Sequence, residues 1–151
     1  MKKKTPAAQL ATFMDRYSPE VAAVAKAALV KLRKRLPGAV EMVYANYNAL
    51  VIGFGPSDRA SEAILSIALY PRWVNLFFLH GAKLPDPHKL LQGKGSQVRS
   101  ILIEDGTILD RREIDDLIEG ALQQNATPFD ATKRRIIKSI SPVQRPRRLG
   151  N

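Results

Sequence analysis

Apolar residues in the first part of the chain recur every three or four positions, which is the spacing of one face of an α-helix. Ser18 and Pro19 begin the longer helical stretch, because serine caps a helix well and proline is tolerated in its first turn. The Pro37-Gly38 pair ends it. We therefore expect two helices, over residues 10–17 and 19–36.

After residue 39 the apolar spacing changes to two, which indicates β-strands separated by turns rich in glycine, proline and serine. A further helical pattern follows in residues 110–124. The expected strands are 40–47, 50–54, 64–70, 73–79 and 98–103. These elements predict an α+β two-layer sandwich, in which a five-stranded, mainly antiparallel sheet carries the N- and C-terminal helices on one face.

Length and charge divide the chain into a central domain and two basic ends. A chain of 151 residues, 45% of them hydrophobic, is long enough for one domain with a core. The net charge of +10 is concentrated in the three lysines at positions 2–4 and in the segment after Gln124. We expect a basic N-terminal extension over 1–6, a domain over 7–124, and a basic, flexible arm over 125–151, in which prolines interrupt the pattern.

Two further features of composition bear on location. No N-terminal apolar run has the length of a signal peptide or a membrane span, and the chain has no cysteine. We therefore expect a cytoplasmic protein without a membrane partner.

One face of the predicted sheet carries aromatic and amide side chains. Strand alternation turns Val74, Leu76 and Phe78 toward the helices and leaves Asn75 on the opposite face. Aromatic rings offer stacking surface and amides offer paired donors and acceptors, a combination that suits a planar ligand. A dimer interface or an ordinary core is the alternative. The candidate ligand-binding residues on this face are Tyr44, Asn46, Tyr47, Tyr70, Trp73, Asn75 and Phe77.

A glycine-containing loop precedes the last predicted strand and is the candidate for an anion site. In Gly93-Lys94-Gly95-Ser96, small residues allow backbone N–H groups to converge, and Lys94 and Arg99 supply positive charge. The spacing is not that of a P-loop. The alternative is a turn that fixes the register of the strand, with Arg99 bound to a carboxylate or a backbone carbonyl.

Several of these segments together resemble a known family. The stretches LPGAVEMVY, ALVIGF, ALYPRW and GKGSQVRSI occur in the order typical of the YdhG-like family, whose domain has no assigned function. The resemblance covers residues 7–124. It implies a frataxin-like sandwich and, as for some members, an intracellular iron chaperone that holds iron on acidic surface residues.

The acidic residues that such an iron site requires occur in the closing helix. The candidate metal ligands are Asp115, Asp116 and Glu119, since hard oxygen donors suit iron. The first long helix departs from this pattern, because its outward positions carry lysines and arginines that repel a metal cation. A solvated face that begins in an acidic first helical turn is the alternative reading of the acidic residues.

The basic arm is the candidate for contact with nucleic acid. Several phosphate contacts from such a segment give salt-sensitive, sequence-independent affinity. A tail that docks on its own domain is the alternative, and the isoleucines within the arm suit docking. The candidate residues are Lys133, Arg134, Arg135, Arg145, Arg147 and Arg148.

The sequence nominates no catalytic residue. His80 and His88 are isolated, and no serine lies in a G-x-S-x-G context. We expect a non-enzymatic binding module for a small anionic or planar ligand, with no cofactor identified and a homodimer as one assembly. The alternatives are an iron chaperone, with iron as its cargo, and a nucleic-acid accessory protein.

Overall fold

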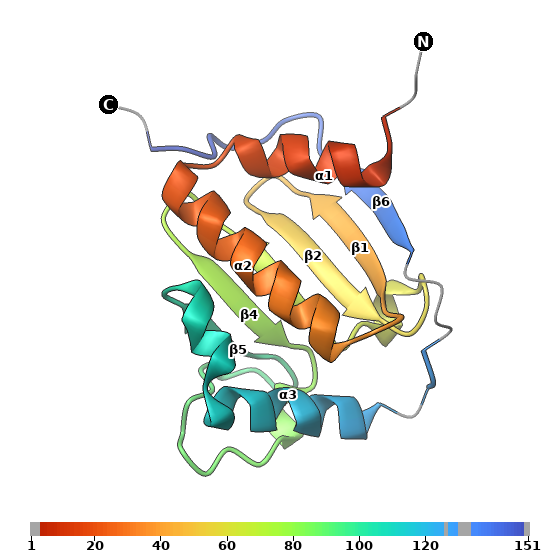
Figure 1. Cartoon of the computed structure of the whole chain (residues 1–151), viewed down its shortest axis with the longest axis vertical. Helices are drawn as coiled ribbons and strands as arrows, with labels where there is room; N and C mark the ends of the chain where they lie inside the picture. The colour runs from red at the N-terminus through yellow and green to blue at the C-terminus, as the bar shows by residue number, and fades with distance from the viewer. Residues whose placement is uncertain (1–3, 126, 130–133, 150–151) are drawn as a thin grey trace.

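The computed structural model describes residues 4–125, 127–129 and 134–149. Two helices, five strands, a third helix and a sixth strand follow one another along the chain in the order α1-α2-β1-β2-β3-β4-β5-α3-β6, with short 3-10 turns between some of them (Figure 1). The bounds are α1 (Pro6–Asp15), α2 (Pro19–Arg35), β1 (Val40–Ala45), β2 (Leu50–Gly55), β3 (Leu65–Leu69), β4 (Val74–Phe78), β5 (Arg99–Ile103), α3 (Arg112–Gln124) and β6 (Arg135–Ile140).

Both N-terminal helices begin at a capping side chain followed by proline. The N–H of Ala8 donates to the Thr5 hydroxyl at 3.1 Å, and the N–H of Val21 donates to the Ser18 hydroxyl at 3.3 Å. These bonds satisfy backbone donors that have no partner inside a helix. The predicted start of α2 is confirmed, whereas α1 begins at Pro6 and leaves a shorter extension than expected.

The sheet has the strand order β5-β4-β3-β2-β1-β6. Strands β1 to β5 form the predicted antiparallel meander. The prediction of a five-stranded, mainly antiparallel sheet is wrong at one edge, because β6 adds a sixth strand parallel to β1 and makes the sheet mixed. This strand lies within the segment that was expected to be a flexible arm, so the sheet extends past the expected domain end at residue 124.

A buried carboxylate and two isoleucines explain why β6 joins the sheet. Glu41 of β1 is 7% exposed and accepts hydrogen bonds from Arg33 of α2 and from Arg135 of β6, with N–O distances of 2.9–3.4 Å. Ile136 packs beside β1 on one face of the sheet, and Ile137 packs against the main core on the other. Docking of β6 therefore pairs a buried charge and covers apolar surface.

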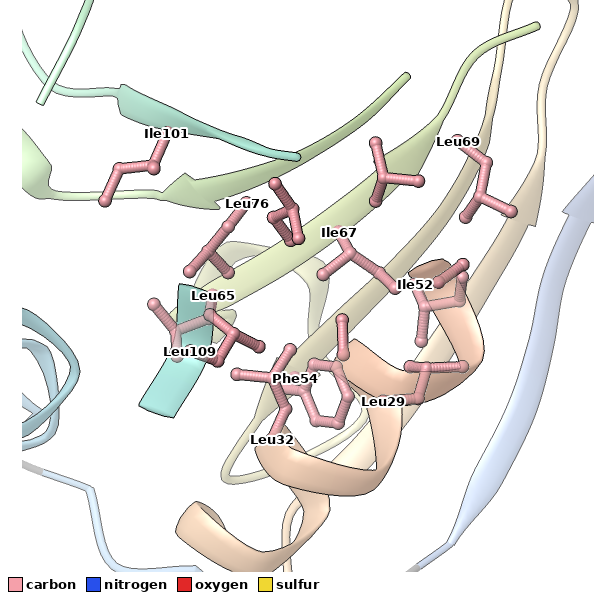
Figure 2. Packing of buried hydrophobic residues seen from close by; sticks show 14 of the residues in the cluster. Leu29, Leu32, Ile52, Phe54, Leu65, Ile67, Leu69, Leu76, Ile101 and Leu109 are labelled. Carbon is pink, nitrogen blue, oxygen red and sulfur yellow. The ribbon is translucent and has the colours of Figure 1, made fainter. Parts of the chain in front are cut away.

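The main core lies between the sheet and the helices. Val74, Leu76 and Phe78 are buried on this side, as the alternation predicts. Figure 1 shows α1 and α2 in front of the sheet and α3 across its lower end. Figure 2 shows Leu29 and Leu32 pointing from α2 toward the strands, where they join the buried cluster of strand side chains. The α+β class and the placement of α2 over the sheet follow from this packing.

The opposite face of the sheet has only a small cluster. Val40 and Met42 of β1 pack there against Ala63, which lies in the connection between β2 and β3. Leu79 and Ile136 pack against the same cluster, whereas α1 and α2 lie on the other side of the sheet and leave the rest of this face without a helix over it (Figure 1). The candidate site lies on this uncovered part of the sheet.

None of the helices in the described ranges combines the length and the apolar content that crossing a lipid bilayer requires.

Candidate ligand-binding face

Strand pairing places specific side chains side by side on the uncovered face. Paired residues on neighbouring strands point to the same side of a sheet. One row runs across β5, β4, β3, β2 and β1, and a second row beside it runs across β5, β4, β3 and β2. The surface is named the open face. Its rows are Leu102–Asn75–Ala68–Val51–Tyr44 and Ser100–Phe77–Ser66–Gly53.

Small and large side chains occupy different strands of the open face. The central strands contribute small side chains, Ser66 and Ala68 on β3 with Gly53 on β2, whereas β4 contributes Phe77 and β1 contributes Tyr44. Neighbouring strands lie about 4.8 Å apart, so β1 and β4 are separated by about 14 Å. Small side chains on β2 and β3 therefore separate the larger side chains of Phe77 and Tyr44, and this strip of the open face is named the trough.

Two aromatic side chains lie in the hairpin between β3 and β4, beyond the ends of these strands. The rings of Tyr70 and Trp73 stack with their centroids 5.4 Å apart and their planes inclined by 29°. The N–H of Tyr70 donates to the Trp73 carbonyl at 2.9 Å, which fixes the hairpin. Trp73 remains 45% exposed, so part of its ring is free to contact a ligand.

Polar side chains flank Phe77 within the trough. Ser66 and Ser100 lie on either side of it in the same row, and Asn75 lies in the next row. A segment outside the named strands adds Gln92, which exchanges two backbone hydrogen bonds of 2.9 Å with Ser100. Gln92 therefore shares the face of Ser100. Its place was not predicted, because an isolated bridge within a loop leaves no periodic signal in the sequence.

Not all of the predicted aromatic and amide set belongs to the trough. Asn46 and Tyr47 lie in the turn between β1 and β2, and their carbonyls accept hydrogen bonds from Arg147 at 2.6 and 3.3 Å. Tyr44 is on the open face, where partial burial raises the pKa of its hydroxyl. The structure thus places Tyr44, Asn75 and Phe77 on one face, with Tyr44 three strands away from the other two. Tyr70 and Trp73 lie in the hairpin beyond the ends of β3 and β4, where Trp73 also lines a hollow with Val21 and Val24 of α2.

The glycine loop uses its arginine internally. Nη1 of Arg99 donates to the carbonyls of Gly95 at 2.6 Å and Val98 at 2.8 Å. Gly93 has φ of 132°, a conformation that favours glycine. Lys94 is exposed. This geometry supports the alternative of a turn that fixes the register of β5, whereas an anion site at Lys94 and Arg99 stays a prediction.

The predicted metal ligands face an arginine. Nε of Arg35 lies 2.6 Å from Asp115 Oδ1, and Nη2 of Arg35 donates to Glu119 Oε2 at 3.0 Å. The hydrogen bond that Arg35 donates to Glu119 raises the pKa of Arg35. Asp116 is exposed. In the part of the chain that the structure describes, no group of three or more His, Cys, Asp or Glu residues is arranged to hold a metal ion. The structure adds no support for iron at these positions.

The basic C-terminal residues contact the domain itself. Arg147 is buried, and Arg148 donates to the carbonyls of Asp15 and Arg16 at the end of α1. Arg145 donates to the side chain of Asn48 at 3.4 Å. These contacts agree with the alternative of a docked tail.

The remaining candidates for nucleic acid contact lie at or before β6. Arg135 pairs with Glu41, Nη2 of Arg134 lies 4.0 Å from Asp58, and Lys133 lies outside the described residues. Contact with nucleic acid through these side chains stays a prediction.

Comparisons with protein-family models, with curated proteins and with solved structures found no match for this chain. The resemblance to the YdhG-like family therefore stays a prediction, and function has to be inferred from the geometry of the open face.

Proposed function

We propose that this protein is a non-enzymatic binding module that holds a planar small molecule on its open face. The observation that supports this proposal is the row in which the partly exposed Phe77 lies between Ser66 and Ser100. Aromatic rings provide stacking surface for a flat ligand, and hydroxyl groups beside them bind its edge.

The side chains of the open face favour a planar ligand with hydrogen-bonding groups on its edge. Asn75 offers both donors and an acceptor, and Gln92 extends the polar set beyond Ser100. A small aromatic amide or a nucleobase has this combination of a flat face and polar edges. An anionic group on the ligand gains less support, because Arg99 is already bonded to two carbonyls of its own loop.

A dimer interface is the alternative use of the same face. Stable homodimer interfaces have an apolar centre. Here the centre of the face contains Ser66, Asn75 and Ser100 around Phe77, which fits ligand binding better than permanent burial against a second copy.

Backbone amide NMR spectra of the full chain test the proposal. Nicotinamide, adenine and uracil serve as planar probes, and cyclohexanecarboxamide is the non-planar control. We expect a planar probe to shift amide signals within residues 66–68, 75–77 and 100–102, with smaller effects from the control. The variant Phe77→Leu keeps an apolar side chain but removes the ring, and we expect it to weaken the shifts several-fold.

The variant Val30→Ala is the matched control, because Val30 is an exposed apolar residue on α2. It should bind the probes as the native chain does. The absence of shifts across the planar panel, or equal shifts in the native chain and Phe77→Leu, would contradict the proposal. Shifts that depend on protein concentration alone would favour the dimer interface.

A further inference from the structure

A groove between α1 and α2 lies on the helix side of the sheet, away from the open face. Figure 1 shows the two helices meeting at the turn between them and diverging from it, with β6 near the first turn of α1. The volume of the groove is about 290 Å³. This surface is named the α1–α2 groove, and its apolar lining consists of Ala7, Leu10, Ala11 and Met14 of α1 with Leu29 and Val30 of α2.

The helical repeat gives the groove two aliphatic walls. The lining residues of each helix, from Ala7 to Met14 and from Lys26 to Arg33, are spaced at i, i+3, i+4 and i+7, so each set lies on one face of its helix. Seven residues of a helix advance by about 10.5 Å, which is the length of an extended medium-chain alkyl group. Val30 is 51% exposed, and none of the described lining residues is aromatic. The groove therefore suits an alkyl chain better than a planar ring.

Two arginines lie at the end of the groove where α1 begins. Arg33, in the last turn of α2, and Arg135, the first residue of β6, both line the groove and both donate to Glu41. The carboxylate side chain is 9% exposed, whereas the side chains of Arg33 and Arg135 are 36% and 26% exposed. Because two cations share one anion, this end of the groove carries a net positive charge.

The pairing with Glu41 leaves part of each guanidinium available. Arg33 and Arg135 donate to the carboxylate from Nε and Nη2, with N–O distances of 2.9–3.4 Å, and Nη1 of neither arginine donates to a described residue. A guanidinium has more N–H groups than these two bonds use. A second carboxylate can therefore accept charge-assisted hydrogen bonds from both arginines. Arg99 differs, because its Nη1 is bonded to two carbonyls of its own loop.

The opposite end of the groove is electrically balanced. Where the two helices meet, Nζ of Lys26 lies 3.7 Å from Oδ1 of Asp15. The groove thus has a cationic end, an aliphatic middle and a neutral end. A molecule with one anionic head group and an aliphatic tail matches this order.

We infer that the α1–α2 groove binds a dissolved medium-chain fatty-acid anion, with its carboxylate at Nη1 of Arg33 and Arg135 and its alkyl chain directed toward Met14. Hydrogen bonds and charge hold the head group, and burial of apolar surface stabilises the chain. This site is independent of the planar-ligand site, because the helices and the open face lie on opposite sides of the sheet.

A backbone amide NMR titration of the full chain with octanoate tests the inference. The net charge of +10 attracts any anion, so the titration is made at about 0.15 M salt, which screens long-range attraction. We expect saturable shifts in residues 7–14 and 26–33 and at Arg135. Acetate has the charge without the chain, and octanol has the chain without the charge, so each should bind at least about fivefold more weakly than octanoate.

Two variants test the two parts of the site separately. Arg33→Gln removes one charge from the cationic end and should weaken octanoate binding at least about fivefold. Lys34→Gln is its matched control, because it removes a charge from the next position of α2, which is exposed and outside the groove, and it should leave affinity within about twofold. Ala11→Leu fills the groove without touching the ion pairs and should also weaken binding at least about fivefold.

Circular dichroism checks that the variants are folded, and Ala11→Leu should be folded because Ala11 is exposed on α1. The absence of saturable shifts with octanoate, or shifts confined to residues 66–68, 75–77 and 100–102 of the open face, would overturn the inference. Equal affinities of Arg33→Gln and Lys34→Gln would overturn the role of the arginines. Native affinity in Ala11→Leu, or acetate that binds as tightly as octanoate, would overturn the place of the alkyl chain, and octanol that binds as tightly would overturn the need for a carboxylate.

Discussion

The guanidinium of Arg147 lies above the ring of Tyr17, with its central carbon 5.6 Å from the ring centroid. The Tyr17 hydroxyl donates to the Leu69 carbonyl at 2.9 Å and accepts from the N–H of Leu50 at 3.0 Å. Arg147 also donates to the carbonyl of Asn46. The C-terminal segment, the loop between α1 and α2, and the ends of β2 and β3 therefore meet at one point.

This contact predicts that Arg147 stabilises the fold. Replacing Arg147 with alanine removes a stacked cation and a short hydrogen bond, and we expect the free energy of unfolding to fall by about 1–3 kcal/mol. Urea denaturation measures the change. Arg145→Ala is the matched control, because Arg145 is exposed and makes one long side-chain bond, and it should change the free energy by less than about 0.5 kcal/mol. Equal effects of the two variants would contradict this role.

The two hydrogen bonds of the Tyr17 hydroxyl are expected to stabilise the fold. Tyr17→Phe leaves a buried N–H at Leu50 and a buried carbonyl at Leu69 without this partner, at a cost of about 1–3 kcal/mol. Tyr47→Phe removes a hydroxyl from a half-exposed side chain and should be nearly neutral. Thermal or urea unfolding compares the two variants, and a neutral Tyr17→Phe would show that the hydroxyl bonds contribute nothing.

The ion-paired Glu41 predicts a dependence of stability on pH. Burial alone raises its pKa, but the hydrogen bonds from Arg33 and Arg135 outweigh burial and lower the pKa below the ordinary glutamate value. Because the folded pKa is lower than the unfolded one, Glu41 stabilises the protein fully above the ordinary value, which is about 4.3, and this contribution is lost as the pH falls toward the lowered pKa.

The variant Glu41→Gln tests this assignment. It should cost about 1–3 kcal/mol at pH 7, less than a fully buried pair, because Arg33 and Arg135 remain partly exposed. The cost should shrink as the pH falls from about 5 to 3, measured as the difference in unfolding free energy between native and variant chains. Asp115→Asn, in an exposed pair with Arg35, is the control and should have little effect. A cost for Glu41→Gln that does not change with pH would contradict the assignment.

The pairing of β6 with β1 predicts that the C-terminal segment is required for folding. A chain that ends at Gln124 loses β6, leaves the edge of β1 unpaired and leaves Glu41 with one arginine. We expect its melting temperature to fall by more than about 10 °C, or the chain not to fold. A chain that ends at Ile140 keeps the strand but lacks Arg147, so it should lose about the 1–3 kcal/mol expected for Arg147→Ala and remain more stable than the chain that ends at Gln124. Equal melting temperatures of the native chain and the chain ending at Gln124 would show that β6 contributes little.

The sequence predicted most of the core elements because their apolar spacing is regular. Strands β1 to β5 begin and end within two residues of the expected limits. The inward positions Leu65, Ile67 and Leu69 are buried, but the outward positions Ser66 and Ala68 of the same strand are buried as well. These elements are neighbours along the chain, so short turns are enough to fix which strands pair.

The sixth strand was not predictable by the same means. Its isoleucines, among them Ile136 and Ile140, lie among arginines, lysines and prolines that indicate a solvated segment. Its partner β1 is distant in the sequence, and the register shifts between Val43 and Tyr44, which breaks simple alternation. Pairing of Arg135 with Glu41 depends on three-dimensional placement that no local pattern contains.

The candidate site was predictable in part. Alternation alone placed Asn75 and Phe77 on the face opposite the helices. The positions of Gln92 and Arg147 could not be predicted from the sequence. Gln92 lies in a loop without periodic pattern, and Arg147 is one of several basic residues in a segment whose composition indicates a solvated surface.

Fluorescence of Trp73 tests the central claim most directly, because Trp73 is the only tryptophan in the chain and lies, stacked on Tyr70, in the hairpin that joins β3 and β4 of the open face. Titration of the full chain with nicotinamide, adenine and uracil should give saturable quenching with at least one planar probe. Phe77→Leu should weaken that binding several-fold, and cyclohexanecarboxamide should have little effect. Quenching that rises linearly without saturation and is the same in the native chain and in Phe77→Leu would contradict binding of a planar ligand on the open face.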